Sequence, residues 1–421
     1  MARILIVSQY FRPDITAAAH RITDLRIFLQ SHGHHVDVIT SFPHKAQVEI
    51  KAEDDYGVAR VRLPIGATSA VGRLWEQSLF ALKALGVFVR RFRKEGYQFV
   101  VASSPPLFVG AVGYVMARWT KAVFILDIRD IWPGSVAAAG VVSGSSFVIR
   151  LASRLERWLY RVADHITCVA RPMKEYIEQY TEPTKIRVVY NGVDVNSRLA
   201  GEQQNSEGGA AVDDRSASMH SNQASEHSDG IICLAYTGNI GLVQDIDVLV
   251  DALKYVQPKT FSRLRIRIIG SGVERDRLEK LVAADPIASR IILFEGPYPK
   301  HVVSDMLSNG SVDALFIHLR SDPILDLTIP SKVFDSCLFN LPIVYGLSGE
   351  GHEILSRLPG TLYFRQGSAR SLGAALDRLV EEYGVLRTRA QSHRAFVEKN
   401  FTREVCFRPF LDIIPRGERS Q

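Results

Sequence analysis

The sequence predicts an α/β protein made of two Rossmann-like, doubly wound parallel-sheet domains that face a cleft. Strand-like apolar runs alternate with helical patterns along almost the whole chain, and this alternation stops only over residues 198–230 before it restarts. The length of 421 residues is more than one hydrophobic core usually serves. We therefore predict an N-terminal domain over residues 1–197 and a C-terminal domain over residues 231–395.

The first elements form a complete βαβ unit. A buried strand is expected over residues 3–10, a helix that ends at Gly33 over residues 18–33, and a second strand over residues 35–42. Two strands joined through a helix run parallel, so this unit predicts a parallel sheet. Further strand-like runs in this half are GVARVRLP, FVVASSP, AVFILDIRD, HITCVA and KIRVVYNG.

The interruption at residues 198–230 contains serine, glycine, asparagine, glutamine and acidic residues, with almost nothing to bury. Such a segment cannot offset the entropy lost on ordering, so we predict a disordered linker. The alternation then restarts with strand-like IICLAYTGN and continues to a long helical tail over residues 369–400. We expect residues 396–421 to pack back on the N-terminal domain.

Composition excludes several classes of protein. With 46% apolar and 23% charged residues, the chain is typical of soluble globular proteins. No apolar stretch reaches the about 20 residues that a spanning helix needs, and the N-terminus lacks a signal peptide pattern. Three of the four cysteines (Cys168, Cys233 and Cys337) lie in apolar runs and fit a reducing compartment. We therefore expect a cytoplasmic protein.

The net charge of +6 favours anionic partners such as nucleotide phosphates or an anionic membrane surface. The helical pattern over residues 74–96 has an apolar side and basic residues clustered toward its end. Such a helix can lie on an anionic membrane as a peripheral contact. An ordinary domain helix with basic residues near its C-terminus explains the pattern equally well.

The stretch AYTGNIG (residues 235–241) predicts a strand, a glycine-rich turn and a helix start. Gly238 and Gly241 allow a ligand to approach the backbone, and a helix N-terminus binds anions. A tight turn without a ligand is the alternative. Gly270 and Gly272 follow the next strand, but they do not complete a dinucleotide-binding fingerprint.

The stretch TIPSKVFD (residues 328–335) is the strongest local candidate for a binding site. Pro330 favours a helix start, and Ser331 and Lys332 follow it in the first turn. Cations are disfavoured at a helix N-terminus, so a diphosphate at the same place would explain Lys332. Asp335, about one turn further, could bind a ribose hydroxyl. The alternatives are that Lys332 points to solvent and that Asp335 is an ordinary acid of the first turn.

The stretch ILDIRDIWPGS places Arg129 and Asp130 at the end of a predicted strand. Ligands of open parallel sheets bind outside the carboxyl ends of the strands, so both residues are candidates for the reacting centre. A salt bridge within the loop is the alternative. The sequence contains no P-loop, nucleophile elbow or zinc signature.

Taken in order, these stretches resemble the family-4 glycosyltransferases of GT-B fold, in particular bacterial enzymes that build O-antigen, capsule and exopolysaccharide. The resemblance extends over nearly the whole chain except residues 198–230. It rests on SSPPLFVGAVGYVMARWTKAVFILDIRDIWPGS, KIRVVYNGVD, LAYTGNIGLVQDIDVLVDAL, IIGSGVERDRLEKL and IPSKVFDSCLFNLPIVYG.

The resemblance implies a hexosyltransferase that moves a sugar from a nucleotide diphosphate sugar, with retention and without a metal or other cofactor. The acceptor would be a glycan or a polyprenyl-linked glycan bound by the first domain, and no nucleic acid is expected. It places Gly238, Asn239, Ser331 and Lys332 at the donor diphosphate and Asp335 at the ribose. The sugar and acceptor would face Arg12, Asp14 and Thr16, with Arg129 and Asp130 at the reacting centre.

The chain differs from many relatives at several of these positions. Leu327, beside Asp326, stands where many carry a second acid, and Arg129 stands where many carry a histidine. The first loop reads DITAAA in place of a glycine pair, and GNIGLVQD lacks the usual arginine and lysine. Two other functions therefore stay open, a nucleotide-sugar epimerase of the same fold and a non-catalytic partner in a glycan assembly complex.

Overall fold

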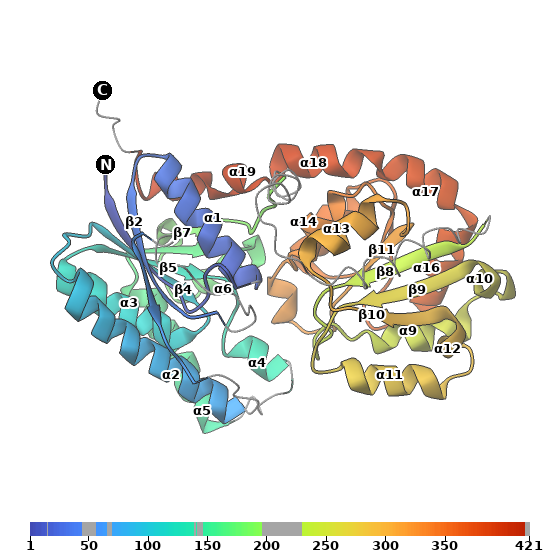
Figure 1. Cartoon of the computed structure of the whole chain (residues 1–421), viewed down its shortest axis with the longest axis horizontal. Helices are drawn as coiled ribbons and strands as arrows, with labels where there is room; N and C mark the ends of the chain where they lie inside the picture. The colour runs from blue at the N-terminus through green and yellow to red at the C-terminus, as the bar shows by residue number, and fades with distance from the viewer. Residues whose placement is uncertain are drawn as a thin grey trace, which may run out of the picture. The chain divides into compact units, whose positions relative to one another are not determined.

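The computed structural model describes residues 1–14, 16–43, 56–64, 70–138, 140, 146–195 and 230–416 (Figure 1). The chain divides into two compact units. The first comprises Met1–Gly192, Leu327–Ile329 and Arg403–Gln421, and the second comprises Val193–Asp326 and Pro330–Thr402. The predicted linker over residues 198–230 lies outside the described residues apart from Gly230.

The first unit contains, within the described residues, a seven-stranded parallel sheet in the order β3-β2-β1-β4-β5-β6-β7. The fully buried Ile4 of β1 lies opposite Val36 on β2 and Phe99 on β4, which confirms the predicted parallel pairing. The apolar runs form these strands because a parallel strand is buried on both faces. The strands are β1 Arg3–Val7, β2 His35–Ser41, β3 Val58–Val61, β4 Phe99–Ser104, β5 Val123–Ile128, β6 His165–Cys168 and β7 Ile186–Val188.

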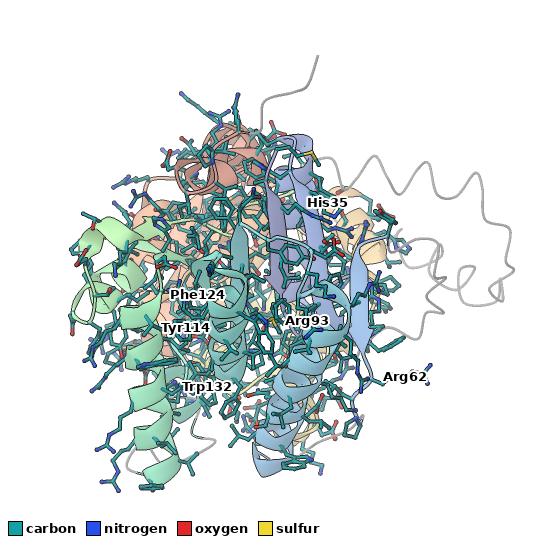
Figure 2. The ribbon with its side chains drawn as sticks, turned by 90° about the vertical axis from the view of Figure 1, so that its left-hand side faces the viewer. His35, Arg62, Arg93, Tyr114, Phe124 and Trp132 are labelled. Atoms are coloured by element: carbon teal, nitrogen blue, oxygen red, sulfur yellow. The ribbon has the colours of Figure 1, made fainter. Side chains whose placement is uncertain are left out.

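The helices of this unit cover both faces of its sheet. Right-handed crossovers place the helix between β1 and β2 on one face, and those that precede β4, β5 and β6 on the other. Figure 2 faces the second group, α2, α3 and α5, which lie side by side. The helices are α1 Ala17–Ser31, α2 Ala70–Val87, α3 Leu107–Thr120, α4 Gly134–Ala138, α5 Phe147–Val162, α6 Arg171–Glu178 and α19 Arg403–Phe407, with 3-10 turns at Pro183–Lys185 and Arg408–Asp412.

Two helical predictions for the first unit need adjustment. The predicted helix over residues 74–96 is α2 up to Val87, followed by a π-helical turn, η2, over Phe88–Phe92. From the sequence we expect residues 396–421 to pack back on the N-terminal domain. The residues from Arg403 onward belong to the first unit. There Phe407, Phe410 and Ile414 join the buried core of the first unit, and α19 packs on α1 (Figure 1).

The second unit contains a six-stranded parallel sheet in the order β10-β9-β8-β11-β12-β13 among the described residues. Its core gathers apolar residues from these strands and from the helices α9 (Asp247–Ala252), α11 (Arg275–Ala284) and α16 (Ala369–Glu381). The strands are β8 Ile232–Thr237, β9 Leu264–Ile269, β10 Ile292–Glu295, β11 Ala314–His318, β12 Ile343–Gly346 and β13 Thr361–Tyr363.

The predicted helical tail over residues 369–400 is not one helix. The backbone leaves helical geometry at Glu382 and tightens to a 3-10 turn at Ala390–Ser392, so three helices result. The helices of this unit are α9 Asp247–Ala252, α10 Pro258–Arg263, α11 Arg275–Ala284, α12 Ala288–Ile291, α13 Lys300–Ser308, α14 Lys332–Cys337, α15 Gly349–Ser356, α16 Ala369–Glu381, α17 Tyr383–Arg389 and α18 His393–Asn400. Short 3-10 turns occur at Leu253–Tyr255 and Leu325–Leu327.

A buried ion pair ties the elements of the first unit together. Arg21 of α1 donates to both carboxylate oxygens of Asp127 on β5, at 2.7 and 3.1 Å, and both side chains are at most 2% exposed. Asp127 also accepts from Thr167 of β6, while Arg21 donates to the carbonyl of Val189. Burial alone would raise the pKa of Asp127, but the facing guanidinium and these hydrogen bonds lower it.

Replacing this arginine should destabilise the first unit strongly. In Arg21→Met the Asp127 carboxylate stays buried without its partner, which costs about 3–5 kcal/mol. The four tryptophans, Trp75, Trp119, Trp132 and Trp158, all lie in this unit, so denaturation followed by tryptophan fluorescence reports on it alone.

Arg118→Met is the matched control, because it breaks the exposed Arg118–Asp164 pair. We expect this variant to lose less than about 1 kcal/mol. Equal shifts of the denaturation midpoint in the two variants would contradict the assigned role of the buried pair.

Candidate functional site

Two glycine-rich loops approach each other closely at the carboxyl ends of β8 and β9. The backbone N–H groups of Gly238 and Ile240 donate to carbonyls at and just beyond the end of β9, both at 2.8 Å. A Cβ atom on Gly270 would lie 1.9 Å from the Gly238 carbonyl oxygen, and one on Gly272 would lie 2.0 Å from that of Ile240. The second pair of glycines, which completes no motif in the sequence, is therefore needed to bring the two backbones together.

Lys332 of α14 lies over the first of these loops. Its Nζ is 3.6 Å from the centroid of the Tyr236 ring, and a Cβ atom on Gly238 would lie 3.0 Å from its Cε. The Nζ is buried and has no hydrogen-bond partner among the residues that the structure describes. Burial lowers the pKa of Lys332 to about 7. The alternative that Lys332 points to solvent is therefore wrong.

The other residues predicted to bind the sugar donor lie on the same two segments, the start of α14 and the loop after β8. Ser331 precedes α14 as its N-cap, and Asp335 lies about one turn after it. The helix begins at Lys332, two residues later than the expected start at Pro330, and ends at Cys337. Asn239 is exposed on the loop after β8, where its side-chain amide donates to Gln244 at 3.4 Å.

His318, at the end of β11, holds the β8–α9 loop in place, and the sequence analysis did not identify it. Its Nε2 accepts from the Gly367 N–H at 3.2 Å, so its Nδ1 carries the proton and donates to the carbonyls of Gln244 and Asp245. Burial lowers the pKa of His318, in keeping with a neutral ring. Its position as the last residue of a buried strand was the available signal in the sequence.

Two arginines also reach this edge of the sheet, although the loop after β8 lacks the basic residues of many relatives. Arg320 donates from its backbone N–H to Val243 and from its guanidinium to the Leu242 carbonyl. Arg275 donates to the carbonyls of Glu295 and Gly296 and so joins the loops after β9 and β10. Each follows the carboxyl end of a strand, and that position could have identified them in the sequence.

An acid also lies at this edge, beside the position where Leu327 replaces the acid of many relatives. Burial raises the pKa of Asp326, while a hydrogen bond from Gln366 opposes the rise. Gln366 in turn donates to the Leu319 carbonyl at 3.1 Å and accepts from Ser348. The Asp326 side chain thus belongs to a polar network built from three loops of the second unit.

In the first unit, Arg129 and Asp130 lie where predicted, at the carboxyl end of β5. The Arg129 guanidinium donates to the Ser103 hydroxyl at 2.8 Å and to the Pro105 carbonyl, so it braces the turn before α3. Burial lowers the pKa of Arg129, and burial raises that of Asp130 even though Ser135 donates a hydrogen bond to it. Neither group forms an ordinary solvated loop salt bridge.

The predicted acceptor residues have three different environments. Arg12 is exposed, whereas Asp14 is buried at 3% exposure. The Thr16 hydroxyl accepts from the Ala19 N–H at 3.2 Å and caps α1, so the structure assigns it a structural contact. Ile15 between them lies outside the described residues. Their predicted roles toward an acceptor stay predictions.

Among the described residues, no three side chains of the His, Cys, Asp and Glu types gather as metal ligands would. No helix in the described part of the chain is long and apolar enough to cross a bilayer. The four cysteines are free and buried. What distinguishes the edge of the second sheet is a cation without an anion, next to backbone that a ligand can approach.

Residues 16–192 match the family described as the glycosyl transferase 4-like domain. No curated protein sequence matches the chain.

Several solved structures share the fold over nearly the full length of both chains. The sucrose-phosphate synthase of Thermosynechococcus elongatus has a TM-score of 0.73 at 16% identity, covering 98% of each chain. HepE of Anabaena, in complex with UDP and glucose, has a TM-score of 0.66 at 13% identity, covering 98% of this chain and 99% of its own. WaaG, a glycosyltransferase involved in lipopolysaccharide biosynthesis, has a TM-score of 0.65 at 13% identity, covering 98% and 100%.

Over residues 16–192 the chain is thus similar to the glycosyl transferase 4-like domain, in keeping with the sequence resemblance. The predicted fold, two parallel-sheet α/β domains of GT-B type, is confirmed by the two sheets and by these structures.

Gly270→Ala should disrupt the paired loops, because the new methyl group would collide with the Gly238 carbonyl. We expect faster amide hydrogen exchange at Gly238 and Ile240, which lose their hydrogen bonds to the β9 loop. Gly384→Ala is the control, since nothing lies within 4 Å of its added carbon. Unchanged exchange at Gly238 in the first variant would contradict the close packing.

Lys332→Met should stabilise the ligand-free protein near neutral pH. Because folding lowers the pKa of Lys332 from 10.5 to about 7, the unfolded chain binds more protons between these values, and wild-type stability rises with pH across that window. Removing the amine should therefore add roughly 2–4 kcal/mol at pH 7 and much less near pH 10.

Melting followed by far-ultraviolet circular dichroism at both pH values measures this gain. Lys254→Met, at an exposed lysine paired with Asp251, is the control and should not stabilise the protein. A Lys332→Met variant no more stable than the wild type at pH 7 would show that burial of the amine does not destabilise the protein.

Proposed function

We propose that this protein transfers a hexosyl group from a nucleotide diphosphate sugar to a glycan or lipid-linked acceptor, with retention at the anomeric carbon. One observation carries the proposal: the buried Lys332 Nζ has no hydrogen-bond partner among the described residues and lies over the Gly238 backbone. An unpaired buried cation is costly and is a mark of functional sites. A diphosphate would supply the missing anion.

The donor is proposed from the chemistry of this edge and from the HepE complex with UDP and glucose. Gly238 has a φ of 116°, a conformation that favours glycine, and it carries no side chain to cover its peptide groups. A diphosphate there would accept hydrogen bonds from Lys332 and the Ser331 hydroxyl, with Asn239 beside it and Asp335 toward the ribose. The proposed binding mode includes no metal ion.

The same contacts would assist the reaction. When the bond from the sugar to the diphosphate breaks, negative charge grows on the leaving phosphate, and a cation already in place stabilises that charge without reorganisation. A bound anion also raises the pKa of Lys332 back from its lowered value, so donor binding recharges the amine. Proton uptake on binding is thus part of the proposed mechanism.

The residues proposed to contact the acceptor lie in the first unit. Arg12, Asp14 and Thr16 border the loop before α1, and Arg129 with Asp130 ends β5, so the sugar and acceptor would meet these residues. WaaG, which shares the fold, is involved in lipopolysaccharide biosynthesis, and this supports a role in cell-surface polysaccharide assembly at the cytoplasmic face of a membrane.

Nucleoside diphosphate binding tests the donor site directly. In titration calorimetry with UDP, GDP and other nucleoside diphosphates, we expect one base to bind the wild type best. Lys332→Met should weaken that binding about 10- to 100-fold, since a hydrogen bond to a charged group contributes roughly 1.5–3 kcal/mol. Lys254→Met should bind as the wild type does.

The uptake of a proton by Lys332 on ligand binding should be measurable in the same calorimetry experiment. At about pH 8.5 the free amine is mostly neutral and the phosphates are fully ionised, so the wild type should take up close to one proton for each ligand bound. Two buffers of different ionisation enthalpy measure this number. Uptake that persists in Lys332→Met would assign the proton to another group.

Transfer itself is tested with nucleotide sugars of the preferred base and a panel of glycan acceptors, with the anomeric configuration of the product read by NMR. A retained configuration is expected. Nucleotide binding without transfer to any acceptor would overturn the catalytic proposal and favour the non-catalytic partner.

A further inference from the structure

The outer face of α5 exposes large apolar side chains. Phe147 and Leu151 are 70% and 57% exposed, and Val148 and Trp158 are 50% and 39% exposed. Phe147, Leu151 and Trp158 follow one another at intervals of four and seven residues, so they form one stripe along the helix. An exposed apolar patch of this kind is more often an interaction surface than the face of an ordinary solvated helix.

The same face carries positive charge without counter-charge. Arg150, Arg154 and Arg161 are exposed, and none forms an ion pair or hydrogen bond with the described residues. The single acid of the helix, Glu156, is 3% exposed and accepts from the Tyr160 hydroxyl at 2.7 Å. An exposed face of arginines and apolar side chains without an acid fits an anionic partner.

The surface continues onto α3 through aromatic contacts. Trp158 meets the Tyr114 ring edge to face, with 5.1 Å between centroids, and the half-exposed Trp119 meets Phe88 of η2 at 6.3 Å. A Cβ atom on Gly110 would lie 2.9 Å from a Leu159 methyl group, so that glycine allows α3 and α5 to pack closely. Figure 2 faces this surface, with Tyr114 labelled between the green α5 and the teal α3.

At the end of α2 the surface becomes strongly basic. A shallow hollow of about 480 Å³ lies along η2 and the turn after it. Four exposed cations, Arg90, Arg91, Arg93 and Lys94, line it. Trp75 and Leu82 on α2, each 67% exposed, extend the apolar part.

We propose that the surface formed by α5, α3 and the α2–η2 segment docks on an anionic lipid bilayer. Tryptophan and phenylalanine side chains would enter the headgroup region, while the arginines keep their charged ends near lipid phosphates. Each basic residue near an anionic leaflet contributes about 1 kcal/mol. The sequence placed a membrane contact only on residues 74–96, whereas here α5 is its centre.

A bilayer explains these features better than a protein partner, because exposed apolar side chains and exposed arginines and lysines occur together over three parallel helices. The inference stands whether or not the protein transfers sugar. If it does, the bilayer would hold a lipid-linked acceptor beside the unit that carries Arg129 and Asp130.

Vesicle binding by the full chain tests the proposal. The probe is a set of phosphatidylcholine vesicles with about one-third phosphatidylglycerol, compared with pure phosphatidylcholine, in a flotation assay. We expect the wild type to float with the anionic vesicles only and to dissociate when salt reaches about 0.5 M. Brominated acyl chains should quench its tryptophan fluorescence.

The double variant Leu151→Ser/Arg154→Gln should lower the partition coefficient about tenfold. The matched control Val385→Ser/Arg389→Gln removes one exposed apolar and one exposed basic residue from α17 and should bind as the wild type does. Circular dichroism confirms that both variants fold. Wild-type protein that stays unbound, or equal losses in the two variants, would overturn the proposal, even if an acidic protein were captured instead.

Discussion

The site of the second unit depends on one steric constraint, the approach of the loop after β9 to the loop after β8. With no side chain at Gly270 or Gly272, the two backbones hydrogen-bond beyond the ends of their strands. This fixes Gly238 in an exposed turn, beside the space that the Lys332 side chain occupies. His318 and Arg320 then hold the rest of the β8–α9 loop against β11.

Within this arrangement stability and function oppose each other. Among the described residues no anion accompanies the buried Lys332 amine, and the face of the Tyr236 ring compensates in part for its burial. A residue selected for folding alone would be apolar here. In the first unit the opposite holds, because the buried Asp127 meets Arg21 and further donors, and the cost of burial is offset within the protein.

Much of the fold follows from local patterns in the sequence. Buried parallel strands are continuous apolar runs, and Gly238 and Lys332 each lie in a stretch whose local chemistry favours an anion. The sequence could not show that these two residues meet, because their approach depends on the packing of the whole sheet. It also could not show the breaks of the tail at Glu382 and Ala390, where tertiary packing overrides a continuous helical pattern.

The residues that sequence reasoning missed act through backbone carbonyls. Arg275 and His318 bind loop carbonyls, so no pair of side chains in the sequence identifies them. Arg129 was a candidate from the sequence, but its contacts with the Ser103 hydroxyl and the Pro105 carbonyl, which brace the turn before α3, were not predictable. The exposed face of α5 was missed for another reason: its pattern is that of any amphipathic helix, and only the structure shows which apolar residues stay uncovered.

The central claim is that the glycine loop and Lys332 together receive a diphosphate. Amide hydrogen exchange of the wild type, measured with and without the nucleoside diphosphate that binds best, tests it most directly. The account predicts slower exchange at residues 238–241 and 331–335. Slowing confined to the first unit, or absent from both of these segments, would contradict it.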